Sequence, residues 1–331
     1  RRWSADHLSE DDPLLIEQIH QRLLPRRGVW ARPEEILITV GAQQAIFLTS
    51  VLFGGPGNRI AVEDPCYPDA RNIFQQFFGH VRPIPVDAQG IRVDQRLSGC
   101  QLLYTTPNRQ YPLSVRMSPE RREQLLSHAQ RHGLIVIEDD YDGEADFDPR
   151  IPPALRSRAG GEQVIYLGTL SKSHNPGLRL GYMVASADFI AEARALRGMM
   201  IRHLPPFMQM AVAQFIHRGH HDALISRLQG VHEQRWRTTR DALERHFPDV
   251  DIHTGYGGTN FVIHADRPLD QARLRREALE SGVVIEDISP CFSKPEEAER
   301  CLRLGVSAIG AKKIARGLRI LRPIYERAQS R

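Results

Sequence analysis

Short apolar runs alternate with helical patterns through the first two thirds of this 331-residue chain. A buried parallel strand reads as a short apolar run, and consecutive parallel strands need a helical crossover between them. The alternation therefore predicts an α/β fold with a mostly parallel sheet flanked by helices. Seven strands are expected in this sheet, at Ile36–Val40, Arg59–Val62, Val81–Pro85, Leu102–Thr105, Leu134–Glu138, Val164–Leu167 and Gly181–Val184.

Helical patterns fill the gaps between these runs. One of them has clear ends, because Ser118 and Pro119 are a cap and a first-turn proline, and Gly133 stops the pattern. The helices expected in this part of the chain are Ala42–Leu52, Ala70–Phe78, Pro119–Arg131 and Ala187–Arg197.

The sequence pattern changes after Leu204-Pro205-Pro206, where long stretches of helical periodicity begin. We expect a smaller α+β C-terminal domain, joined to the sheet domain by a long helix. The expected division of the chain is an N-terminal segment at 1–32, the large domain at 33–205, and the linker helix with the small domain at 206–331. The expected helices are Met208–His217, Asp222–His246, Leu269–Ser281 and Ala311–Tyr325, and the expected strands are Gly258–His264, Val283–Glu286 and Cys301–Val306.

Charge and cysteine usage exclude several classes of protein. Lys and Arg number 44 against 40 Asp and Glu, and the arginines are scattered along helical stretches, as at Arg121, Arg122 and Arg131. They predict a solvated surface rather than the basic stripe of a nucleic-acid binder. The four cysteines lack metal-ligand spacing, which favours reduced thiols in the core over a zinc site or disulfides.

No apolar run is long enough to span a bilayer and the first residues do not resemble a signal peptide, so a cytoplasmic protein is expected.

Lys172 follows the apolar run Val164–Leu167 and stands among small hydroxyl residues, in Gly168-Thr169-Leu170-Ser171-Lys172-Ser173. Arg179 comes seven positions later. This arrangement suits a phosphorylated aldehyde, because the amine forms a Schiff base with the carbonyl while hydroxyls and a guanidinium hold the phosphate. The alternative is an ordinary solvated lysine in a polar loop.

A second informative segment ends a predicted strand with the acidic residues Glu138, Asp139 and Asp140, followed by Tyr141. Acidic side chains at the carboxyl end of a strand face the crevice where α/β sheets bind ligands. A carboxylate there can pair with a protonated pyridine nitrogen and keep the ring an electron sink. Alternatively, Asp139 or Asp140 only caps the next turn.

Three further segments add candidate binding residues. Gly41-Ala42-Gln43 opens a helix and offers backbone N–H groups to an anion, but there is no GxGxxG fingerprint, so a nicotinamide enzyme gets little support. Tyr67 lies just past a strand end, where its ring stacks on a flat cofactor or packs in the core. Arg303 lies inside an apolar strand and needs an anion, either an internal carboxylate or a substrate one, and we favour the substrate.

Taken in their order along the chain, the five segments together resemble the fold type I pyridoxal 5′-phosphate (PLP) enzymes of the class I/II aminotransferase family. The similarity runs over roughly Ile36 to Ile320 and is closest to the aminotransferase-like domain of MocR-type regulators and their free-standing relatives. The resemblance implies a large PLP-binding domain, a small C-terminal domain and a homodimer, because active sites in this family borrow residues across the interface.

The resemblance also implies roles for individual residues. Lys172 would be the Schiff-base lysine and would move the proton between substrate Cα and cofactor C4′. Asp139 would pair with the pyridine nitrogen, and Tyr141 would lie near the phenolic oxygen. Arg303 would bind the α-carboxylate of an amino-acid substrate. Stacking on the ring and holding the phosphate would fall to Tyr67, to the turn Gly41-Ala42-Gln43, and to Thr169, Ser171 and Arg179.

The chain departs from the family pattern in three places. Tyr111 takes the position of the usual asparagine, as an aromatic does in MocR-type relatives, so Asn108 or Tyr141 would contact the phenolic oxygen in its place. The N-terminal arm is expected to be missing or shortened, with segment 1–32 packing on the small domain. His174 follows the lysine in an unusually polar run and is either a second acid/base group or an exposed loop histidine.

The leading hypothesis is a PLP-dependent aminotransferase of amino-acid metabolism that acts on an amino acid and a 2-keto acid by a ping-pong Schiff-base mechanism. One alternative is the ligand-sensing effector domain of a MocR-type transcriptional regulator, although no part of this chain reads as a helix-turn-helix. Another keeps PLP but ends in elimination, decarboxylation, racemisation or oxidation in a biosynthetic pathway.

Overall fold

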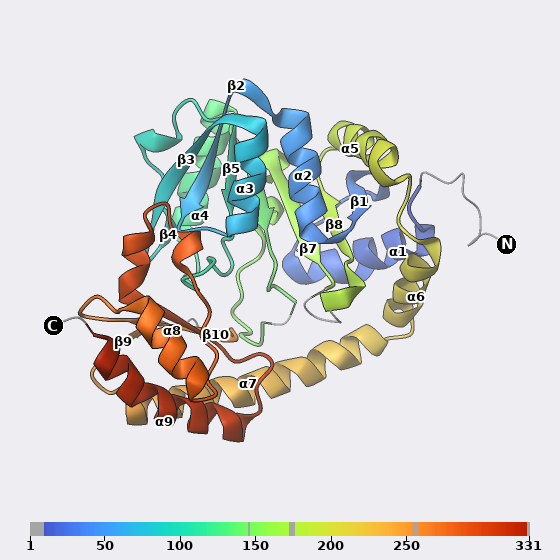
Figure 1. Cartoon of the computed structure of the whole chain (residues 1–331). Helices are drawn as coiled ribbons and strands as arrows, with labels where there is room; N and C mark the ends of the chain where they lie inside the picture. The colour runs from blue at the N-terminus through green and yellow to red at the C-terminus, as the bar shows by residue number, and fades with distance from the viewer. Residues whose placement is uncertain (1–9, 145, 172–175, 254–256, 330–331) are drawn as a thin grey trace.

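An eight-stranded sheet forms the centre of the larger lobe in the computed structural model, which describes residues 10–144, 146–171, 176–253 and 257–329 (Figure 1). The strand order is β1-β8-β7-β6-β5-β2-β3-β4. The pairings from β3 through β2, β5 and β6 to β7 are parallel, whereas β8 and β4 run antiparallel to their neighbours. The strands are β1 (Ile36–Thr39), β2 (Gly55–Asp64), β3 (Phe78–Asp87), β4 (Gly90–Ile91), β5 (Leu102–Thr105), β6 (Ile135–Asp139), β7 (Val164–Thr169) and β8 (Gly181–Val184).

All seven predicted strands of this sheet are present, and the prediction of a mostly parallel α/β domain is confirmed. The eighth strand, β4, was not predicted, because a two-residue strand has no periodicity to detect. It folds back on the end of β3, where Val86 pairs with Ile91 and Asp87 with Gly90.

Helices cover both faces of the sheet. Helices α2, α3 and α5 pack on one face through side chains such as Ile46, Phe74 and Ile190, whereas α4 packs on the other through Leu125. The helices are α1 (Pro13–Gln18), α2 (Gly41–Phe53), α3 (Pro68–Phe77), α4 (Pro119–His132), α5 (Ala187–Ile201), α6 (Pro206–His217), α7 (His220–His246), α8 (Gln271–Glu280) and α9 (Ala311–Ala328). Short helical turns lie at Ile19–Leu23, Leu24–Arg27, Pro33–Glu35, Gln95–Leu97, Leu155–Ser157, Gly161–Gln163, Pro176–Leu178, Ser289–Cys291 and Pro295–Arg300.

Helix α4 starts and stops at its predicted signals, but one of its arginines does not lie on the surface. Ser118 Oγ accepts from the backbone N–H of Arg121 (3.1 Å), and Gly133 ends the helix at φ 65°. Arg122, predicted to be solvated, is fully buried and donates to the carbonyl oxygens of three loop residues at 3.0–3.1 Å. Burial lowers its pKa to about 10. The guanidinium therefore fastens loops beneath the helix.

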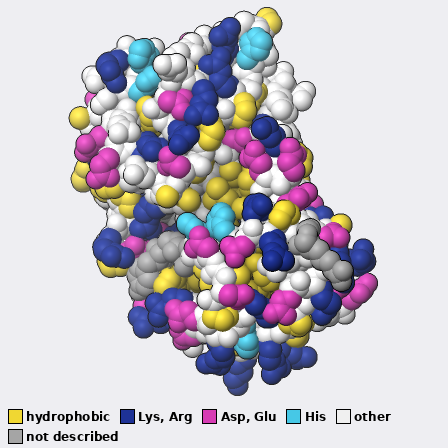
Figure 2. Space-filling view, turned by 90° about the vertical axis from the view of Figure 1, so that its left-hand side faces the viewer, with side chains coloured by type: hydrophobic (Ala, Val, Ile, Leu, Met, Phe, Trp, Pro, Cys, Tyr) yellow, Lys and Arg dark blue, Asp and Glu magenta, His cyan; other side chains and the backbone are white. Residues whose placement is uncertain are grey.

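The smaller lobe is built on a three-stranded antiparallel sheet of order β11-β10-β9. Its strands are β9 (Asp251–His253), β10 (Asn260–His264) and β11 (Cys301–Gly305). Helices α8 and α9 and the second half of α7 share its core, to which Trp236, Phe261 and Leu318 contribute. Helix α7 runs under both lobes, and Figure 2 shows hydrophobic side chains gathered in the hollow at the waist between them. Within the described residues, no helix combines the length and the apolar character needed to cross a membrane.

The predicted strand Val283–Glu286 is wrong, because residues 283–288 form no strand. The segment leaves α8 through Gly282 at φ +78°, and the next apolar residues do not all turn inward. Val284 is 83% exposed, whereas Ile285 and Ile288 are buried. A short run of three consecutive apolar residues therefore does not mark a strand here. Conversely, β9 escaped prediction because its three residues are polar at both ends.

The described part of the N-terminal segment packs on the larger lobe and on α6, whereas the small domain was the expected partner. Leu15, Ile19 and Leu23 share a core cluster with β1, β8 and α6. Asp11 reinforces this attachment, because its buried carboxylate pairs with Arg194 (2.5 Å) and Arg197 (2.6 Å) from α5. The proposed boundaries at 32/33 and 205/206 stay predictions.

Replacing Asp11 by alanine should lower the free energy of unfolding by about 3–5 kcal/mol, because the fully buried Arg197 loses its carboxylate partner. Urea denaturation measures this change. The neighbouring exposed residue provides the control, since Glu10→Ala should stay within about 0.5 kcal/mol of wild type. Equal unfolding midpoints for Asp11→Ala and wild type would contradict the attachment.

Candidate active site

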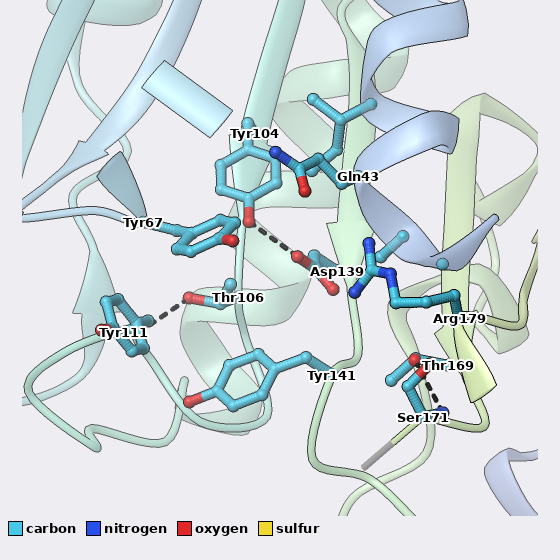
Figure 3. A pocket seen from close by; sticks show the side chains of 13 residues that line it. Gln43, Tyr67, Tyr104, Thr106, Tyr111, Asp139, Tyr141, Thr169, Ser171 and Arg179 are labelled. Carbon is cyan, nitrogen blue, oxygen red and sulfur yellow. Dashed lines mark hydrogen bonds between the residues drawn. The ribbon is translucent and has the colours of Figure 1, made fainter. Parts of the chain in front are cut away.

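A cavity of about 290 Å³ opens at the sheet edge where β5, β6 and β7 end and α2 begins (Figure 3). It brings together every described residue that the sequence analysis assigned to a cofactor, except Asn108. The lining residues are Gly41, Ala42, Gln43, Ile46, Tyr67, Tyr104, Thr106, Tyr111, Asp139, Tyr141, Thr169, Ser171 and Arg179. Residues far apart in the chain meet here because strands of one direction end at the same edge.

One end of the cavity is built for an anion. Helix α2 starts at Gly41 directly after β1, so the first backbone N–H groups of a 13-residue helix point into it. The Arg179 guanidinium faces this helix end, with the Thr169 and Ser171 side chains beside it (Figure 3). A Cβ at Gly41 would come within 3.3 Å of Arg179 Nη2, and Gly41 has φ +69°. Glycine therefore allows the guanidinium to lie close against the start of the helix.

A buried carboxylate lies in the middle of the cavity. Asp139 is the last residue of β6 and is 5% exposed, and its Oδ2 accepts from the Tyr104 hydroxyl (2.7 Å; Figure 3). Burial raises the pKa of Tyr104 well above its ordinary value, so it remains a hydrogen-bond donor to Asp139. The pair presents a fixed negative group to whatever occupies the cavity.

Three tyrosines form an aromatic wall opposite Arg179. The Tyr67 and Tyr111 rings lie edge to face with centroids 5.7 Å apart, and Tyr111 and Tyr141 follow at 6.3 Å. Burial raises the pKa of all three phenols above the usual value, so the wall stays uncharged at neutral pH. Such a wall suits a flat ring.

A buried carboxyl holds the loop that carries this wall. Glu63 accepts from the hydroxyls of Thr105 (2.5 Å) and Thr106 (2.7 Å). Thr106 Oγ1 in turn accepts from the Tyr111 backbone N–H (3.0 Å; Figure 3). Burial raises the pKa of Glu63 to about 7. Glu63 thus positions Tyr111 from below the cavity without lining it.

Arg303 does not line this cavity, and its partner here is an internal carboxylate. Nη1 pairs with Glu286 Oε2, and the guanidinium carbon lies 4.9 Å from the Tyr111 ring centre. The sequence analysis favoured a substrate carboxylate over an internal one. The structure shows the internal partner, and the role in substrate binding stays a prediction.

The other predicted residues are placed as follows. Lys172 and His174 lie outside the described residues. Asn108 is buried (2% exposed), and neither polar atom of its amide has a hydrogen-bond partner within the described parts of the chain. The Asn108 amide therefore remains a candidate to form hydrogen bonds with a bound ligand.

Sequence reasoning missed Tyr104, Thr106, Glu63 and Glu286. Tyr104 had a detectable signal, because it is a phenol in an otherwise apolar strand that leads into a polar loop. Glu63 had a similar one at the end of β2. Glu286 had none, since its segment was read as a strand.

Comparisons with known proteins come from sequence and from structure. Residues 10–321 match the family described as aminotransferase class I and II. The HTH-type transcriptional regulator TauR of Rhodobacter capsulatus is 37% identical over 317 residues, which cover 96% of this chain and 66% of TauR. The 2-aminoadipate transaminase of Thermus thermophilus is 30% identical over 302 residues, which cover 88% of this chain and 76% of that protein.

A solved structure shows the same architecture. LysN, an α-aminoadipate aminotransferase from Thermus thermophilus complexed with N-(5′-phosphopyridoxyl)-L-leucine, aligns with a TM-score of 0.86 at 28% identity. The alignment covers 96% of this chain and 82% of LysN.

The chain spans about two thirds of the length of TauR.

The stability of the fold should depend on Glu63 between about pH 4.5 and 7, because its pKa rises from 4.5 to about 7 on folding. In this window the folded state keeps a proton that the unfolded state has released, so the free energy of unfolding falls as pH rises. Glu63→Gln mimics the protonated carboxyl and should flatten this decline in urea unfolding at the two pH values. The exposed substitution Glu120→Gln should keep the wild-type slope. An unchanged slope in Glu63→Gln contradicts the assignment.

Proposed function

We propose that this chain, which belongs to the aminotransferase class I and II family, is a PLP-dependent aminotransferase domain that takes an amino acid and a 2-keto acid as substrates. The observation that carries the proposal is one cavity holding three features in a row. These are the anion site at Gly41 and Arg179, the Asp139 carboxylate, and the aromatic wall that begins at Tyr67.

Pyridoxal 5′-phosphate, the cofactor that this family implies, fits these features. Its phosphate matches the helix N-terminus, the Thr169 and Ser171 hydroxyls and the guanidinium. When bound, PLP supplies a pyridinium ring that withdraws electrons from the Cα of an amino acid.

Each side chain of the cavity then has a task that suits its surroundings. Asp139 holds a proton on the ring nitrogen, and Tyr104 orients the carboxylate by donating to Oδ2. Tyr67 covers one ring face and keeps water from it. Lys172 is proposed to bond the cofactor aldehyde and to carry the substrate's Cα proton, and Arg303 to bind its α-carboxylate.

A second candidate function is favoured by the similarity to a regulator. TauR is a transcriptional regulator by name, and this chain matches 66% of it at 37% identity. In that case the same cavity would bind PLP and an amino compound to sense the ligand rather than to turn it over. The cavity supports both candidates up to the binding of the amine.

The two functions differ in their products. The protein loaded with PLP and incubated with a panel of amino acids should lose the absorbance of its bound cofactor, release a 2-keto acid and regain the absorbance when another keto acid is added. Ligand-induced spectral changes without keto acid would indicate a sensor.

Under both functions, borohydride should trap a cofactor adduct on Lys172, identifiable by peptide mass spectrometry and absent from Lys172→Ala. Protein that never acquires this adduct contradicts both.

We also propose a homodimer, supported by exposed apolar side chains where α5 meets α6. Met199 is 80% and Phe207 65% exposed, and Met200, Ile201 and Met208 lie beside them in the chain. The variant Met199→Glu/Phe207→Glu should therefore sediment as a monomer at concentrations where wild type is a dimer. Leu279→Glu, on α8 and 64% exposed, is the matched control and should leave the assembly unchanged. A monomeric wild type refutes the proposal.

A further inference from the structure

Arg303, the proposed binder of the substrate carboxylate, already has a carboxylate beside it. Its Nη1 pairs with Glu286 Oε2, and the Tyr111 hydroxyl donates to Glu286 Oε1 (2.8 Å). Tyr111 lines the candidate active site and stacks on the guanidinium. Glu286 therefore holds both the arginine and the aromatic residue that lies between it and the cavity.

The two partners of this ion pair are unequally buried. The Arg303 side chain is 9% exposed, whereas that of Glu286 is 44% exposed. Removing the carboxylate partner of a buried guanidinium leaves an uncompensated charge, which costs several kcal/mol. A half-exposed carboxylate loses little when it returns to water. One anion can therefore replace another at Arg303 at small net cost.

Arg303 also has a hydrogen-bond donor to spare. Its Nε is buried and has no hydrogen-bond partner among the residues that the structure describes. A guanidinium offers donors in a planar fork that matches a carboxylate bidentately. A single bond to Glu286 uses only part of that capacity, and a ligand carboxylate that gripped two donors would bind better.

The position of Glu286 in the chain allows it to move aside. It lies in residues 283–288, which belong to no helix or strand. Ile285 and Ile288 anchor this segment in the core on either side, while the Glu286 side chain between them is 44% exposed. Turning the side chain away breaks the bonds to Arg303 and Tyr111 and leaves the buried contacts intact.

We propose that Glu286 is an internal competitor for the carboxylate site of Arg303, which an incoming amino acid must displace. This inference rests on the proposed function, in which Arg303 binds the α-carboxylate. Glu286 keeps the guanidinium neutralised while no ligand is present and weakens the binding of every ligand that uses the same donors. The ligand class is a small molecule with a carboxylate next to an amine.

The substitution Glu286→Gln tests the competition directly. Glutamine keeps an oxygen that accepts from Tyr111 but removes the charge that binds Arg303. The probe is 2-methylalanine, an α-amino acid without a Cα proton, so that binding is measured without turnover. In isothermal calorimetry with PLP-loaded protein, Glu286→Gln should bind it about 5-fold more tightly than wild type. Glu280→Gln, an exposed acid at the end of α8, should bind it as wild type does.

Arg303→Leu in both backgrounds completes a double-mutant cycle. The gain from Glu286→Gln should vanish when Arg303 is leucine. If Arg303→Leu weakens binding but Glu286→Gln does not strengthen it, the competition is refuted and the proposed role of Arg303 stands. If Arg303→Leu has no effect, the role of Arg303 in the proposed function fails as well. Weaker binding by Glu286→Gln, or no binding by either protein, also overturns the competition.

Discussion

Strands of one direction end at one edge of the larger sheet, and the whole candidate active site depends on that shared edge. Asp139 is the last residue of β6 and Thr169 the last of β7. Strand β1 runs the same way as β7, because both are antiparallel to β8, so α2 begins at this edge too. Neighbouring strands lie about 4.8 Å apart, which is why residues more than one hundred positions apart can line one small cavity.

Buried arginines recur through the molecule, and the exposure of their carboxylate partners differs. Arg27 and Asp140 are 4% and 1% exposed at their side chains, and Arg109 and Asp146 are 1% and 0% exposed. Both members of these pairs are out of reach of solvent and ligand, so the pairs hold the fold. Arg303 differs because its partner carboxylate is 44% exposed. The proposed exchange with a ligand rests on this half-exposed partner.

The order of helices and strands in the larger lobe could be predicted, because each buried strand is a short apolar run with a helix after it. The strand predicted at Val283–Glu286 failed because a short apolar run also occurs in an irregular segment that has no pairing strand. The role of Tyr104 was missed because a tyrosine in a strand is usually interpreted as a core residue. The pairing of β5 with β6 brings its hydroxyl to Asp139. For Arg303 the sequence shows that an anion is needed, but the partner comes from an irregular segment whose path only tertiary packing determines.

Helix α7 is one continuous helix that connects the two lobes. Its 27 residues span about 40 Å at 1.5 Å per residue. Gln229 fixes the first half to the larger lobe by donating to the Asp146 carbonyl (2.9 Å), and Trp236 and Leu243 belong to the core of the smaller one. A tilt of about 5° at the first end would move the far end by about 3.5 Å, by the geometry of a rod of that length. Arg303 belongs to the smaller lobe and Tyr111 to the larger, so such a tilt would change the 4.9 Å separation between the guanidinium and the Tyr111 ring.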